Sequence, residues 1–154
     1  MLDESSTVTA RSEGIAKHVV GAVVHHAGAV LLLTRSVSDA FLPGIEELPS
    51  GGVEDGETLA QALDRELLEE VGFPAGTVDP GFLATFDYLS GSGRPTRQFT
   101  VSVPWDDRAV VLSDEHSAYR WVDRSDIDTS SATAETQGVI DAWFDWVRAE
   151  NQRA

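Results

Sequence analysis

Glutamates near residue 70 have the residue type and the spacing to bind a hard metal ion. Glu66, Glu69 and Glu70 fall in one predicted helix, where side chains four residues apart project only about 40° from each other. Carboxylates at that spacing repel, and the later two also lie near the helix C-terminus, where the helix dipole disfavours anions. A divalent cation removes both penalties, and Mg²⁺ suits a phosphate-bearing substrate because it keeps several of its waters. The spacing therefore predicts a Mg²⁺ site, which Mn²⁺ could also fill.

The helix that carries these acids is bounded by its own capping signals. Thr58 and Gln61 form a capping box, so the helix is predicted to begin directly after Thr58. Gly72 occupies the position of a glycine that ends a helix. Between the caps, apolar residues recur every four positions at Leu59, Leu63, Leu67 and Val71. The acids therefore flank a stripe that must be buried, which argues against the alternative of an ordinary solvated acidic face.

The segment from Gly51 to Phe73 resembles the Nudix box, G-x5-E-x7-R-E-U-x-E-E-x-G-U, in which U is aliphatic. Its seven fixed positions are matched by Gly51, Glu57, Arg65, Glu66, Glu69, Glu70 and Gly72. Leu67 fills the first U and Phe73 the last, where an aliphatic residue is usual. The resemblance implies a hydrolase that uses a divalent metal and water to cleave a nucleoside diphosphate linked to another moiety. It also implies the Nudix α/β/α sandwich, a central mixed β-sheet between helices.

The resemblance further implies the metal ligands. Glu66, Glu69 and Glu70 would hold the metal, helped by the backbone carbonyl of Ser50. MutT-type sequences have glycine at that position. Serine keeps the carbonyl ligand but narrows the conformations open to the loop.

Structural and proton-transfer roles follow from the same resemblance. Arg65 would pair with Glu57 and tie the loop before the helix to the helix itself. A carboxylate would take the proton of the attacking water. Glu66 is the first candidate for this base, and Glu115, an acid in a loop ahead of an aromatic-bearing strand, is the competitor. The sequence leaves that choice open, and a surface glutamate is the alternative for Glu115.

Two arginines and three aromatic residues are the candidates for substrate contacts. Arg94 and Arg97 are basic residues of an acidic protein beside a predicted loop between strands, so they could bind phosphate; a solvated loop is the alternative. Phe41, Phe86 and Tyr88 are candidates to stack on a nucleotide base. Tyr88 lies 16 residues beyond Gly72, an arrangement similar to that of diadenosine polyphosphate hydrolases.

The identity of the substrate is left open by the sequence. The small size and the MutT-like loop favour a nucleoside triphosphate, including an oxidised or modified one. A nucleotide sugar, ADP-ribose or a dinucleoside polyphosphate is the alternative within the same chemistry. A function of another class is a non-catalytic Nudix-like nucleotide sensor, against which the complete motif and the net charge of −15 argue.

The composition fits one compact enzyme domain without disulfides. Of the 154 residues, 42% are hydrophobic and none is cysteine, which excludes disulfides and thiolate metal sites. The formal net charge of −15 disfavours binding to nucleic acid or to an anionic membrane, where basic patches are needed. No signal-peptide pattern or membrane-length apolar run is present, so a cytoplasmic location is expected. The family resemblance adds a homodimer to these expectations.

The remaining elements are predicted from apolar patterning. Residues 1–16 are expected to form a flexible tail and residues 17–154 a single Nudix domain. Amphipathic spacing predicts a last helix over residues 133–150. Strands are predicted at residues 17–26, 29–34, 46–48, 78–89, 97–103 and 119–122. Strands with helices among and after them predict the α/β class.

Overall fold

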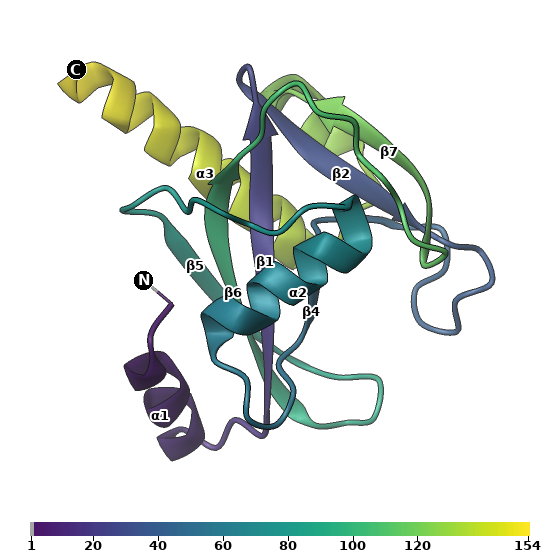
Figure 1. The fold of residues 1–154 in the computed structure, drawn as a ribbon, viewed down its shortest axis with the longest axis vertical. Coiled ribbons are helices and arrows are strands. Elements are labelled where there is room, and N and C mark those ends of the chain that lie inside the picture. Colours follow the sequence, from purple (N-terminus) through teal and green to yellow (C-terminus); the bar gives the residue numbers. More distant parts are fainter. Residues whose placement is uncertain (1) are drawn as a thin grey trace.

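A mixed sheet of seven strands forms the centre of the protein in this computed structural model, which describes residues 2–154 (Figure 1). The strand order is β3-β2-β1-β6-β5, with β4 paired to β1 and β7 paired to β2. The pair β1–β6 is parallel, and the other pairs are antiparallel. The strands are β1 (Lys17–His26), β2 (Ala29–Arg35), β3 (Glu46–Glu47), β4 (Ser50–Gly52), β5 (Leu83–Leu89), β6 (Pro95–Pro104) and β7 (His116–Val122).

Helices cover both faces of this sheet, so β1 is buried on both sides. Helix α2 (Leu59–Val71) packs on one face and α3 (Ala134–Arg153) on the other (Figure 1). Val24 of β1 belongs to the α2 core and Val23 to the α3 core, and both are fully buried. Burial on two faces explains why β1 reads as a continuous apolar run instead of an alternating one. The predicted α/β fold with a central mixed sheet between helices is confirmed.

The sequence predicted the boundaries of the helices more closely than those of the strands. Helix α2 has the predicted capping box, and it ends at Gly72, whose φ of 92° lies in the left-handed region. The strand expected at residues 46–48 is β3, and a second short strand, β4, follows Pro49, where no strand was predicted. The strand expected from residue 78 begins at Leu83, directly after a turn at Gly81 with φ of 95°.

The segment before β1 contains a helix that was not predicted. Helix α1 (Glu4–Ser12) begins after the N-cap Asp3 and buries Ala10 completely, and Ile15 after it joins the α2 core. The expectation of a flexible tail over residues 1–16 is therefore corrected for this helix. The reason is sparse patterning: two buried apolar residues anchor the segment, too few to produce a visible periodicity. A short 3-10 helix, η1 (Arg124–Thr129), connects β7 to α3.

Among residues 2–154, no helix is both long enough and apolar enough to cross a membrane.

Candidate active site

Glu70 is a carboxylic acid that α2 buries against the loop at β4. Only 4% of the residue is exposed, and its Oε2 accepts a hydrogen bond from the backbone N–H of Ser50 at 2.9 Å. Burial raises the pKa of Glu70 to about 9, and the nearby charges of Glu47, Glu66 and Glu115 add to the rise. Without a cation, this carboxyl group therefore keeps its proton at neutral pH.

Glu66 lies one helical turn before Glu70 and fills the space beneath Gly51. A Cβ atom at Gly51 would lie 1.9 Å from Cδ of Glu66, so only glycine fits at that position of β4. The Glu66 side chain is 12% exposed, and burial raises its pKa while the hydrogen bond from Arg65 opposes the rise. Glu69, by contrast, is 58% exposed. The three predicted metal ligands thus share one helix but differ in burial.

Arg65 connects the loop before α2 to helix α2 itself. Its Nε and Nη2 donate to the two carboxylate oxygens of Glu57 at 2.7 and 2.8 Å, and Nη2 also donates to the carbonyl of Gly52 at 2.9 Å. Its Nη1 donates to Oε1 of Glu66 at 2.6 Å. The guanidinium group lowers the pKa of Glu57 to about 2. One side chain therefore fixes the loop, β4 and a candidate metal ligand relative to each other.

Glu115 lies near the buried acids although it is far from them in sequence. Its charge contributes to the raised pKa values of both Glu66 and Glu70. It is exposed, and its backbone carbonyl accepts from the N–H of Ser36 at 2.9 Å. This position, close to the acids and open to solvent, is consistent with either role considered for it.

Glu47 is a further acid near the site, and the sequence did not single it out. It accepts hydrogen bonds from Nε2 of the buried His116 at 2.8 Å and from Nη1 of Arg35 at 3.1 Å. Its charge contributes to the raised pKa values of Glu70 and Tyr88. The sequence signal that could have identified Glu47 was its place on a predicted strand just before the Ser50 loop. Its partners on β2 and β7 could not be predicted from local spacing.

The donor chemistry at α2 fits a hard divalent ion. Among the hydrogen bonds of residues 2–154, none involves Oε2 of Glu66 or Oε1 of Glu70, so each carboxylate keeps one free oxygen. Within the same residues, no three acidic or histidine side chains are already arranged to hold a metal. A buried, protonated acid beside other carboxylates is nevertheless the environment that a divalent cation would stabilise. The chemistry of these residues suits a divalent ion, although their side chains are not already arranged around one.

The predicted aromatic contacts lie on the side of the site formed by the strands. Tyr88 is half-buried on β5, and its ring lies 5.7 Å from that of Phe86. Burial, followed by the charge of Glu47, raises the Tyr88 pKa, which places this side chain near the acids. Phe41, in the loop after β2, is 46% exposed, and its ring lies 3.5 Å from the position of a Cβ at Gly91.

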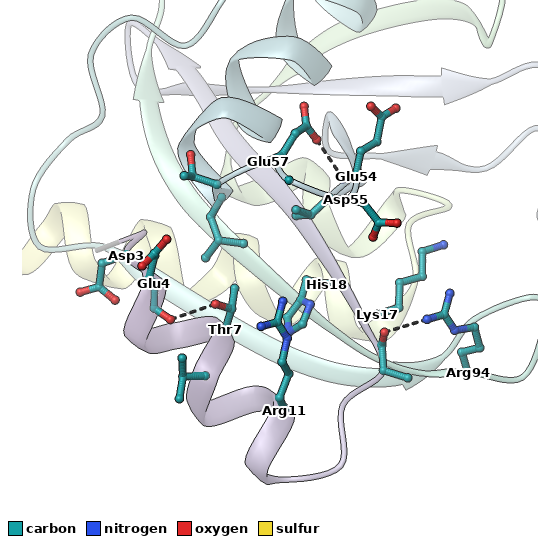
Figure 2. Close-up of a pocket in the computed structure, with 16 residues that line it drawn as sticks. Asp3, Glu4, Thr7, Arg11, Lys17, His18, Glu54, Asp55, Glu57 and Arg94 are labelled. Carbon is teal, nitrogen blue, oxygen red and sulfur yellow. Dashed lines mark hydrogen bonds between the residues drawn. The ribbon is translucent and has the colours of Figure 1, made fainter.

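The two predicted phosphate-binding arginines are not beside the acids. Arg97 is paired with Asp87 and Glu13, at 2.7 and 2.6 Å, and shares its face of β6 with Phe99 of the α2 core, opposite to Thr96, the partner of Tyr88. Arg94 donates from Nη2 to the carbonyl of Ala16 at 2.8 Å. It lines a cavity of about 420 Å³ between α1 and the loop before α2 (Figure 2). The structure thus separates the basic candidates from the acidic ones.

Curated relatives of the chain are nucleotide hydrolases. The asymmetrical bis(5'-nucleosyl)-tetraphosphatase of Sus scrofa is 39% identical over 77 residues, which cover 48% of this chain and 52% of that protein. The nucleoside triphosphatase NudI of Escherichia coli O17:K52:H18 is 29% identical over 129 residues, covering 77% of this chain and 92% of that one. The chain thus matches about half the length of the first relative and nearly all of the second.

Solved structures and a family model agree with these relatives. The MutT protein of Methanosarcina mazei Go1 superposes with a TM-score of 0.74 and 26% identity, covering 88% of this chain and 97% of that one. The Ap4A hydrolase of C. elegans, in a binary complex, shares the fold with a TM-score of 0.75 and 23% identity, covering 87% and 99%. Residues 16–144 match the family model described as NUDIX domain. That match spans most of the chain, the acids of α2 lie within it, and the protein therefore belongs to the NUDIX domain family.

Proposed function

We propose that this Nudix hydrolase cleaves a pyrophosphate bond of a nucleoside triphosphate, oxidised or modified ones included, with Mg²⁺ as its metal and Mn²⁺ as a substitute. The observation that carries the proposal is Glu70, a 4% exposed acid with a pKa of about 9 beside three other carboxylates. A fold gains nothing from such an acid in the absence of a cation, because burial and repulsion both oppose its charge. The similarity to NudI, a nucleoside triphosphatase, supports the choice of substrate.

Residues of α2 and β4 would bind the metal and hold its carboxylate ligands in position. A bound divalent cation would neutralise phosphate oxygens and lower the pKa of a water. Glu66 and Glu70 would hold it through their free oxygens, with Glu69 and the Ser50 carbonyl completing the ligands. The Ser50 N–H fixes Oε2 of Glu70, and Arg65 fixes Oε1 of Glu66, so neither carboxylate rotates freely. Such preorganisation is what electrostatic catalysis requires.

A carboxylate must then accept the proton of the attacking water. Glu66 remains our first candidate, because its Oε2 is free of hydrogen bonds to the described residues. If Oε2 takes the proton, Glu69, Glu70 and the Ser50 carbonyl would hold the metal without it. Glu115 is the competitor, because it is exposed and its charge reaches both buried acids. A base needs access to the water as well as a suitable pKa.

A dinucleoside polyphosphate is the second candidate substrate. Tyr88 and Phe86 present adjacent aromatic rings close to the acids, a surface on which a nucleotide base can stack. The pig relative, a bis(5'-nucleosyl)-tetraphosphatase, matches about half of this chain at 39% identity. Nucleotide sugars and ADP-ribose stay as further alternatives, and a non-catalytic nucleotide sensor as the alternative of another class.

A product assay across a substrate panel tests the proposal. Purified protein with Mg²⁺ would be given nucleoside triphosphates, a dinucleoside tetraphosphate, ADP-ribose and a nucleotide sugar, and products would be resolved by chromatography and ³¹P NMR. We expect a nucleoside monophosphate and pyrophosphate from a triphosphate. Preferred cleavage of the dinucleotide would make the second candidate the function. Nucleotide binding without any turnover, with Mg²⁺ or Mn²⁺, would instead identify a sensor.

We also propose a homodimer, the assembly expected from the family, and its mass by light scattering is the test.

A further inference from the structure

Within residues 2–154, three cationic side chains have no carboxylate partner. The sequence has eleven lysines and arginines, and eight of them form ion pairs within 4.0 Å. Among residues 2–154, those without such a pair are Arg11, Lys17 and Arg94. With 26 acidic residues available, unpaired cations are unexpected unless something else binds them. All three line the same 420 Å³ cavity.

The cavity lies between α1, the first residues of β1 and the loop before α2 (Figure 2). Its volume falls within the roughly 300–1,000 Å³ of small-molecule sites. Figure 2 shows Arg11 and His18 near each other on the side of α1, with Lys17 and Arg94 at the β1 side. The cations therefore reach the cavity from α1, from the start of β1 and from the distant residue Arg94 before β6.

His18 supplies an independent sign of a missing ligand. The residue is 9% exposed, and its Nε2 is buried without a hydrogen-bond partner within the described part of the chain. Buried polar atoms almost always have partners, and one that lacks them is costly to the fold. Burial lowers the pKa of His18, the positive charges of Arg11 and Arg97 lower it further, and a backbone hydrogen bond with Thr7 opposes the fall. Positive charges therefore lie near this ring, as an anion requires.

The acids that line the cavity restrict which kind of anion can bind there. Asp3 accepts from Ser6 in its capping role, and Glu57 is held by Arg65. Glu4, Glu54 and Asp55 line the cavity without a hydrogen bond to their carboxylates among residues 2–154, and Glu54 lies 3.9 Å from Nη1 of Arg65. Cations beside such carboxylates suit an anion that accepts hydrogen bonds from the cations and donates one to a carboxylate. Hydrogen phosphate and protonated pyrophosphate have a P–OH donor, whereas sulfate has none.

We propose that this cavity binds a phosphate or pyrophosphate group through Arg11, Lys17, Arg94 and Nε2 of His18. The site adjoins the catalytic loop: Cε of Lys17 lies 3.5 Å from the position of a Cβ at Gly52, whose carbonyl binds Arg65. Arg11 precedes residues 16–144, the part that matches the family model, so α1 adds this site to the shared fold. The phosphate comes either from the terminal group of a bound substrate or from pyrophosphate released as product. Both sources rest on the proposed hydrolysis, whereas binding of pyrophosphate by the metal-free protein does not.

Titration of the metal-free protein with pyrophosphate tests the site without any turnover. In EDTA, calorimetry should show saturable binding, and the imidazole resonances of His18 should shift in ¹⁵N-edited NMR. The variant Arg11→Gln/Arg94→Gln should weaken binding at least about tenfold, a loss that calorimetry resolves easily. Sulfate at the same concentration should bind at least about tenfold more weakly than pyrophosphate.

A matched pair of exposed arginines on α3 provides the control. Arg148→Gln/Arg153→Gln makes the same change in net charge on side chains that are 67% and 75% exposed. This variant should bind pyrophosphate as the wild type does. If Arg11→Gln/Arg94→Gln lowers the melting temperature too far for titration, Lys17→Gln replaces it, because that residue makes no ion pair within residues 2–154.

Steady-state kinetics distinguish the two sources of phosphate. If the substrate's own terminal phosphate occupies the cavity, Arg11→Gln should raise KM about tenfold and leave kcat unchanged. If released product occupies it, KM should stay constant while the effect of added pyrophosphate on the rate disappears in the variant. No saturable binding by the wild type, equal binding of sulfate, or equal weakening by the control variant would overturn the proposal.

Discussion

At Glu66 and Glu70, burial and repulsion by neighbouring carboxylates act in the same direction, and both raise the pKa of the carboxyl group. Replacing either by glutamine keeps the shape and removes the charge. We therefore expect Glu66→Gln and Glu70→Gln to lower kcat by about 100-fold or more, because each removes a group that fixes charge at the reacting phosphate. The metal-free fold should be at least as stable as the wild type. Near wild-type rates for both variants at saturating Mg²⁺ would contradict the assignment.

Glu115→Gln decides between the two candidate bases. If Glu115 accepts the proton, this variant should lose as much rate as Glu66→Gln while its affinity for Mg²⁺, measured by calorimetry, stays unchanged. If Glu115 only contributes its charge to the electrostatic potential at the site, kcat should change by less than about tenfold.

Gly51 tests how closely β4 must approach Glu66. The change Gly51→Ala would place a Cβ 1.9 Å from Cδ of Glu66, so the carboxylate must move. Misplacement of about 1 Å can cost roughly 100-fold in rate, and we expect a loss of that size in kcat. Gly138→Ala is the matched control, because that glycine lies within α3 with open space around it. Full activity and a slightly raised melting temperature are expected there.

The acids of α2 could be predicted from sequence, whereas their strand partners could not. Residues three and four apart on one helix meet by geometry alone, and so Glu66 and Glu70 were identifiable. The contact between Glu47 and His116 joins β3 to the start of β7. It exists only because both strands pair with β2, and local spacing carries no information about that pairing.

At the scale of elements, Arg65 is the connection between α2, β4 and the loop before the helix. Arg65→Ala leaves the Glu57 carboxylate without its partner and releases Glu66. We expect kcat to fall at least about tenfold and the melting temperature to fall as well. Calorimetry and steady-state kinetics measure both. An active variant of unchanged stability would show that the connection is unimportant.

Helices were predicted better than short strands because their signals are local. Capping residues and four-residue spacing defined α2, and Thr133 began α3 as expected. Helix α1 escaped prediction because its anchoring depends on contacts with distant segments, such as the ion pair between Glu13 and Arg97. Arg97 itself was predicted to bind phosphate, and its pairing with Asp87 and Glu13 could not be seen in the sequence.

For the whole molecule, Glu70 makes metal-free stability depend on pH. Its pKa is about 9 when folded and close to 4.5 when unfolded, so the folded state binds the proton more tightly. The free energy of unfolding should therefore fall as pH rises between those values, by up to about 1.4 kcal/mol per pH unit. Thermal melts in EDTA from about pH 5.5 to 8.5 measure this slope. Glu70→Gln should flatten it, and an unchanged slope would show that another group is responsible.

Mg²⁺ should reverse that loss. An ion that binds only the folded state stabilises it by mass action, about 2.7 kcal/mol at 100 times its Kd. Since the ligands must lose their protons, the gain should increase with pH. Melting temperatures with Mg²⁺ and with EDTA, compared at two pH values, check both expectations. Full turnover in excess EDTA would exclude a metal-dependent mechanism.

The parallel pairing of β1 with β6 also determines when the site can form during synthesis. Lys17 pairs with Thr96, so the chain between them must close as one large loop before the centre of the sheet exists. Such non-local pairing folds slowly, because the entropy of closure is lost before the contacts are gained. On the ribosome, the apolar strand β1 must wait for β6 to emerge. Until then its valines remain exposed and prone to association with other chains, and α2 has no completed sheet on which to place its acids.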